Sequence, residues 1–228
     1  MLHDLSLVSS APDARPGAPR DWRADLDPSA LPPTPHLTAG QRRVLSACLE
    51  LFATRGFLAS STRDIAAALG MRSPSLYNHF PSKDAMLSSL VALGYEYYDS
   101  RVTSAVLAAG ATPAEQLSAV IREHVLISCE FARLTVVIQQ ELEHLASEAL
   151  ATIVSYRAHT VVLVEKILQR GHDEGSFDVV HPRTTISALG SMGSSAAQTY
   201  PYRPDLEADS YADEFVELAL RLVGATSR

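Results

Sequence analysis

The chain has 228 residues, of which 46% are hydrophobic and 7% aromatic, and its formal net charge is -7 at pH 7. No apolar run approaches the ~18 residues that a membrane-spanning helix needs, and residues 1–10 lack the basic and apolar regions of a secretion signal. We therefore expect a globular cytoplasmic protein with no membrane partner. The two cysteines, Cys48 and Cys129, have no Cys or His nearby at metal-ligand spacing. We interpret both as buried thiols and expect neither a metal nor a cofactor.

The negative total charge conceals a basic segment. Between Thr38 and Lys83 six cationic residues stand against two carboxylates, a net charge of +4, which leaves -11 for the rest of the chain. The six cations are Arg42, Arg43, Arg55, Arg63, Arg72 and Lys83. Because Lys and Arg neutralise phosphates when a protein binds DNA, this distribution predicts a small DNA-binding module attached to an acidic body.

Residues 1–36 are expected to form a disordered arm. They hold seven of the 13 prolines and show little apolar periodicity. Arg15, Arg20 and Arg23 suit a DNA groove, but the neighbouring Asp13, Asp21, Asp25 and Asp27 offset their charge. We therefore favour no DNA-binding role for the arm.

A helix-turn-helix is predicted over residues 37–84. A first helix begins at Thr38 and ends at Gly56, a residue that tolerates a left-handed backbone. Two short helices follow, one capped by Ser61 or Thr62, the other starting at Ser73 with a proline in its first turn. A glycine turn at Gly70 separates them, which is the arrangement of a helix-turn-helix.

Residues 85–228 are expected to form a larger helical domain. Ser82 caps a helix that runs to about Val102, and Thr112 with Glu115 forms a capping box for the next. Further amphipathic stretches run from about 131 to 144, 147 to 170, 182 to 200 and 206 to 223. Breaks are expected at Gly171, Gly175, Pro201 and Pro204. Since no strand pattern or glycine-rich phosphate loop is found, we predict an all-α fold of about nine helices.

The segment 61–83, STRDIAAALGMRSPSLYNHFPSK, carries the functional information. Small residues at 66–68 let the first short helix approach the second, and the second then enters the major groove of DNA. Asn can bond adenine, Arg can bond guanine, and Tyr and His can reach phosphate oxygens. The side chains expected to point outward are Arg72, Ser73, Ser75, Tyr77, Asn78 and His79.

This segment closely resembles the signature of the TetR family. In this chain the pattern reads LFA-x-x-GF, then T-x-x-I-A-x-x-x-G, then L-Y-x-H-F-x-S-K. It is matched by Leu51, Phe52, Ala53, Gly56, Phe57, Thr62, Ile65, Ala66, Gly70, Leu76, Tyr77, His79, Phe80, Ser82 and Lys83. The resemblance implies a dimeric regulator that binds a double-stranded DNA operator, with a C-terminal domain for ligand binding and dimerisation.

The resemblance also assigns the DNA contacts. It implies that Thr62, Tyr77, His79 and Lys83 contact phosphates. It implies that the bases are met by Arg72, Ser73, Ser75 and Asn78. Arg63, next to Thr62, is a further candidate DNA contact.

For the C-terminal domain the resemblance implies a homodimer in which the last two long helices pack against their copies. The final helix presents Tyr211, Phe215, Leu218, Ala219 and Leu222 at helical spacing, which suits a symmetric interface. The tail from Tyr200 to Val223 is similar to regulators that sense acyl-CoA thioesters, so we expect a small amphipathic effector that releases a repressor from its operator. Candidate ligand-binding residues are Gln140, His144, Tyr156, Arg157 and Gln198.

Two alternatives remain open at this stage. Glu141 and His144 form an E-x-x-H pair at di-iron spacing, but a ferritin-like site needs a second such pair, and we find none. We therefore predict that the chain is not an enzyme. The other alternative, a constitutive dimeric DNA-binding regulator without an effector, has the same sequence pattern.

Overall fold

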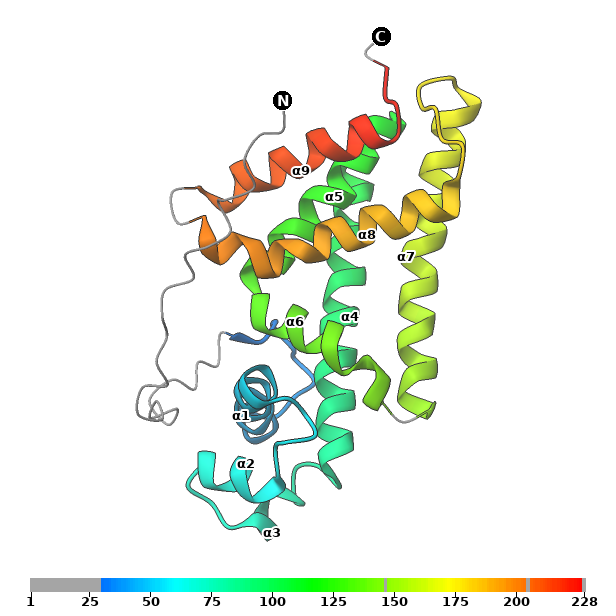
Figure 1. Ribbon diagram of the computed structural model, residues 1–228. Helices are drawn as coiled ribbons and strands as arrows, with labels where there is room; N and C mark the ends of the chain where they lie inside the picture. The colour runs from blue at the N-terminus through cyan, green and yellow to red at the C-terminus, as the bar shows by residue number, and fades with distance from the viewer. Residues whose placement is uncertain (1–29, 146, 204–205, 227–228) are drawn as a thin grey trace.

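The computed structural model describes residues 30–145, 147–203 and 206–226, and over these ranges the chain forms helices and no strand (Figure 1). The α-helices are α1 (Ala39–Arg55), α2 (Thr62–Ala68), α3 (Ser73–Leu76), α4 (Lys83–Ala108), α5 (Pro113–Glu130), α6 (Ala132–Glu141), α7 (Ser147–Asp173), α8 (Pro182–Thr199) and α9 (Ala208–Leu222). Two 3₁₀ turns, Leu142–His144 and Tyr200–Tyr202, follow α6 and α8. The predicted all-α fold is confirmed. None of these helices combines the length and the apolar character that crossing a membrane requires.

Side-chain caps start the helices where the sequence predicts them. Ser61 accepts a hydrogen bond from the N–H of Asp64, and the Asp64 carboxylate accepts one from the N–H of Ser61. Thr112 forms the same reciprocal box at the start of α5, and Ser82 caps α4. Each cap satisfies a backbone donor that the first helical turn leaves unpaired.

Helix α4 connects the two ends of the molecule (Figure 1). Its first half, with Leu87 and Leu90, is buried in one apolar cluster together with α1, α2 and part of α6. Its second half, with Val102 and Val106, is buried in a second cluster among α5, α7, α8 and α9. The helices at the N-terminal end therefore share their core with α4 and α6 and do not form a core of their own.

Helix α7 corrects the prediction of a break at Gly171. The helix continues through this glycine to Asp173, and the chain turns only at Gly175, which has a φ of 68°. A side chain at Gly171 would collide with the ring of Phe177. The glycine therefore permits close packing of the following loop against the helix.

The segment just before α1 corrects the prediction of disorder up to residue 36. Residues 30–36, which we call the strap, pack across α1, and Leu31 is 1% exposed. The Arg42 guanidinium donates hydrogen bonds to the carbonyls of Leu31 (2.5 Å) and Pro32 (2.7 Å) and to the hydroxyl of Thr34 (2.9 Å). Residues 1–29, including Arg15, Arg20 and Arg23, lie outside the described residues.

Helix α9 packs on α5, which corrects part of the expected dimer interface. Tyr211, Phe215 and Ala219 are buried within the subunit. Leu218 and Leu222, which border this buried face, remain 49% and 47% exposed.

The strap yields a stability prediction. Arg42→Met removes the donor from two backbone carbonyls and a hydroxyl, and we expect a loss of about 1–3 kcal/mol in the free energy of unfolding. That loss lowers the Tm by several degrees for a chain of this length. The control is Arg43→Met, the same substitution at the neighbouring exposed position, which should leave the Tm unchanged. Equal Tm values for the two variants would show that the strap is not held by Arg42.

Candidate DNA-binding surface and ligand cavity

The helix-turn-helix has the predicted geometry at its turn. Gly70 adopts a φ of 66°, and the N–H of Met71 returns to the carbonyl of Ala66 at 3.0 Å. Leu76 and Phe80 are 0% and 5% exposed and lie in the first apolar cluster. The side of the second helix that carries Leu76 and Phe80 is thereby packed into the core. The side with the outward residues remains accessible.

The nine expected DNA contacts all lie between α2 and the first residue of α4. Arg63, Arg72 and Asn78 are exposed, and Tyr77 is 52% exposed, so these four side chains are accessible to DNA. The half-buried members are Thr62, Ser73, Ser75, His79 and Lys83.

His79 lies against the start of α1 instead of extending freely into solvent. A β-carbon at Gly40 would come within 2.5 Å of its ring. Gly40 therefore allows the imidazole of His79 to approach the first turn of α1 closely.

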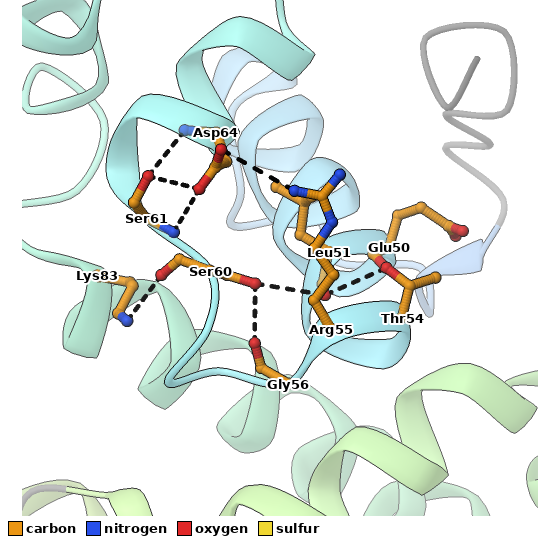
Figure 2. A network of polar contacts seen from close by, with 9 residues as sticks. All are labelled: Glu50, Leu51, Thr54, Arg55, Gly56, Ser60, Ser61, Asp64 and Lys83. Carbon is orange, nitrogen blue, oxygen red and sulfur yellow. Dashed lines mark hydrogen bonds and ion pairs between the residues drawn. The ribbon is translucent and has the colours of Figure 1, made fainter. Parts of the chain in front are cut away.

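Lys83 has an internal role that the sequence did not predict (Figure 2). Its ammonium group donates hydrogen bonds to the carbonyls of Phe57 and Ser60, both at 2.8 Å, and lies 4.1 Å from the centre of the Phe57 ring. The Ser60 hydroxyl in turn donates to the carbonyl of Gly56 at 2.8 Å. Lys83 thus holds the α1–α2 loop (residues 56–61), and two of its three N–H donors are already used.

The same loop is held from the other side by the end of α6. The Glu141 carboxylate, which is 5% exposed, accepts a hydrogen bond from the N–H of Phe57 at 2.9 Å. The imidazole of His144 stacks on the Phe57 ring with centroids 5.9 Å apart and lies 3.6 Å from Glu141. The E-x-x-H pair is therefore a contact between the C-terminal helices and the α1–α2 loop. In the described ranges no group of three or more potential ligands is arranged to hold a metal.

A cavity of about 680 Å³ lies among α4, α5, α6, α7 and α8. Its walls are mainly apolar and aromatic, and Pro32 of the strap contributes to them. The described lining includes one arginine, Arg157, and one histidine, His124, but no lysine or carboxylate. A mainly apolar cavity of this size with a few polar groups suits a small ligand.

Two of the five predicted ligand-binding residues line this cavity, namely Arg157 and Gln198. Gln140 is exposed and lies outside the lining, whereas its neighbour Gln139 is part of it, because adjacent helix positions point about 100° apart. His144 contacts Phe57 instead. Tyr156 is half-buried on α7 and also lies outside the lining.

Hydrogen bonds organise the α8 side of the cavity. His124 Nε2 lies 3.1 Å from the hydroxyl of Ser194, and Gln139 donates to the Ser194 carbonyl at 3.2 Å. Gln198 donates to the side chain of Gln139 at 3.2 Å. Burial lowers the pKa of His124 to about 4, so its ring is neutral at pH 7.

The sequence contained a signal for His124 that the predicted site omitted. The apolar stripe of α5 passes through Leu117, Val120 and Ile127, and His124 occupies the helical position between the last two. A polar ring on an otherwise apolar stripe marks a core position that needs a hydrogen-bond partner.

Two family models match this chain. The model described as "Bacterial regulatory proteins, tetR family" matches residues 44–90, and "Tetracyclin repressor-like, C-terminal domain" matches residues 110–223, half of the chain. The chain belongs to the TetR family. It is therefore a DNA-binding transcriptional regulator and not an enzyme.

Individual TetR-family relatives agree with this assignment. The transcriptional repressor KstR2 of Mycolicibacterium smegmatis is 34% identical over 88 residues, which are 38% of this chain and 42% of the relative. A TetR-family structure from Rhodococcus RHA1 is 26% identical with a TM-score of 0.77, covering 83% of this chain and all of the other. AibR in complex with isovaleryl coenzyme A and operator DNA is 23% identical with a TM-score of 0.71, covering 82% and 99% of the two chains.

The position of Lys83 leads to a second prediction. Lys83→Met should lower the Tm, since two carbonyls of the α1–α2 loop lose a charged donor at a cost of about 1–3 kcal/mol. Arg63→Met, at an exposed position, should leave the Tm unchanged. It should instead reduce the slope of log affinity for DNA against log salt concentration by about one, the contribution of one phosphate contact. If Lys83→Met kept the wild-type Tm while reducing the salt dependence, Lys83 would be a phosphate contact and not a loop anchor.

Proposed function

We propose that this TetR-family chain is a dimeric repressor in the cytoplasm, released from a pseudo-palindromic operator when a small amphipathic effector occupies the cavity. In this proposal residues 37–84 bind DNA, and residues 85–228 bind the effector and dimerise. The DNA contacts are the nine residues between Thr62 and Lys83 described above, with Lys83 contributing chiefly through the α1–α2 loop.

The observation that carries this proposal is the position of α6 between the cavity and the DNA-binding helices. Leu134, Ile138 and Gln139 of α6 line the cavity. Elsewhere on the same helix, Glu141 bonds the α1–α2 loop and Arg133 contacts the Glu50 carboxylate of α1 at 2.6 Å. Any ligand that shifts α6 therefore changes contacts that position the helix-turn-helix. A coupling of about 1–3 kcal/mol would change operator occupancy by roughly 5 to 150-fold.

The relatives support both halves of the proposal. KstR2 is named a transcriptional repressor, and AibR has been solved with both a coenzyme A thioester and operator DNA. In this chain the cavity has apolar walls and Arg157 is exposed at its rim, with no carboxylate in the described lining. An effector with an apolar body and an anionic group, such as an acyl-CoA, complements that arrangement.

Dimerisation is proposed through α8 and α9. The exposed part of α9 carries Leu218 and Leu222, and α8 carries the exposed residues Thr184 and Ala188 outside the cavity lining. Small side chains allow two helices to approach closely, and a symmetric pairing would bury the exposed leucines. Two copies would then present their recognition segments to major grooves roughly 34–36 Å apart.

The function is tested by DNA binding with and without candidate effectors. Purified protein should retard DNA from the intergenic region upstream of its own coding sequence in a gel shift. Isovaleryl-, octanoyl- or palmitoyl-CoA should release it, while free coenzyme A serves as the control. Retention that none of these thioesters changes would favour a constitutive regulator, and no retention would contradict the choice of operator or of the DNA-binding residues.

The division between base and phosphate contacts gives another prediction. Asn78→Ala should cost roughly 1–3 kcal/mol on the specific operator and relax the preference at one base pair. Tyr77→Phe removes only a hydroxyl and should weaken specific and non-specific DNA alike. Binding-site selection from randomised operators distinguishes the two, and an unchanged preference for Asn78→Ala would remove Asn78 from the base contacts.

A further inference from the structure

One residue of the strap reaches the cavity directly. Pro32 is buried and forms part of the cavity wall, whereas all other residues of the described lining lie at Gly94 or beyond. The strap leads within a few residues to Thr38, which caps α1. Among the described residues, Pro32 is therefore the point at which a molecule in the cavity would touch the part of the chain that precedes α4.

The strap is stiff at this contact. A proline ring fixes its own φ at about −65°, and a residue that precedes a proline is held in an extended conformation. Both restrictions act on Pro32, because Pro33 follows it. Rotation of its own backbone can therefore absorb little of a displacement of the Pro32 ring, and the adjacent peptide groups must move with it.

Arg42 of α1 binds the peptide groups on both sides of the Pro32 ring. Its guanidinium donates hydrogen bonds to the carbonyl of Leu31 at 2.5 Å and to the carbonyl of Pro32 itself at 2.7 Å. Hydrogen bonds from a charged donor are stronger than neutral ones. A displacement of Pro32 therefore acts on a side chain near the start of α1.

The start of α1 in turn lies against the recognition segment. The ring of His79 is so close to Gly40 that a β-carbon there would come within 2.5 Å of it. The N–H of His79 bonds the carbonyl of Leu76, the last residue of α3, at 2.9 Å. Since Gly40 and Arg42 lie two positions apart in one helix, a shift at Arg42 changes the contact between α1 and the recognition segment.

We propose that the strap is a second coupling element between effector and operator. The effector displaces Pro32, and Arg42, as a positioning residue, passes the displacement to the start of α1 and so to His79. This inference rests on the proposed function, since it assumes that the cavity holds the effector. The route is separate from that of α6, which acts through the loop at the other end of α1.

The coupling factor of the full-length protein tests this inference. It is the ratio of the operator Kd with a saturating thioester to the Kd without it, measured by fluorescence anisotropy with isovaleryl-, octanoyl- and palmitoyl-CoA. Wild-type protein should give roughly 5 to 150 with at least one of them. Arg42→Met should lower this factor about 2- to 10-fold, as substitutions along a coupling route commonly do. Because both Kd values belong to one variant, a change in DNA affinity alone cancels from the ratio.

A second variant and two controls separate coupling from stability. Pro32→Gly removes the ring from the cavity wall and frees the backbone while keeping Arg42, and it should lower the coupling factor by a similar amount. Arg43→Met, at the neighbouring exposed position, should keep the wild-type factor. Thr112→Ala removes the side-chain cap of α5 and should lower the Tm, yet it should also keep the wild-type factor.

The possible contrary results have different meanings. The wild-type coupling factor in Arg42→Met or in Pro32→Gly would overturn the inference and leave the proposed function intact. An equal loss of coupling in Thr112→Ala would also overturn it, because the effect would then come from stability. Wild-type protein whose operator affinity none of the three thioesters changes would overturn the proposed release by an effector, and this inference with it.

Discussion

The hydrogen bond between the Glu141 carboxylate and the N–H of Phe57 joins two parts of the molecule that are 84 positions apart in the chain. Because the carboxylate is almost fully buried, losing its donor would leave it poorly solvated, which is a large cost in a protein interior. The end of α6 and the α1–α2 loop must therefore move together or not at all. Lys83 holds the same loop from α4, so the position of the recognition segment depends on both helices.

The ring of Phe57 is the common element of these contacts. The ammonium group of Lys83 lies over it, His144 stacks on it, and Phe52 meets it edge to face at 5.3 Å. Aromatic and cationic contacts of this kind depend on orientation as well as distance. These contacts fix both the position and the orientation of the α1–α2 loop. Under the proposed function, a shift of α6 would therefore change the orientation of the DNA-binding helices.

Capping residues and helical periodicity predicted the helices well. The features that these local patterns did not predict depend on contacts between residues far apart in the chain. The caps at Ser61, Ser82 and Thr112 depend only on neighbouring residues, so the sequence placed them correctly. Gly171 has the local features of a helix end, but its role is set by a ring that packs against it. Helical periodicity also identified apolar faces without showing that five helices leave a space between them. The polar residues of the cavity, His124 above all, therefore stayed outside the predicted site.

Under the proposed function, the strap allows the ligand selectivity of the cavity to change without any change in a helix. Pro32 forms part of the cavity wall, yet it precedes residue 44, where the first family match begins. Substitutions there can reshape the space offered to a ligand while the helix-turn-helix and the packing of α4 to α9 stay intact. Divergence between close relatives can therefore arise in a stretch that a comparison of their domains alone would leave out.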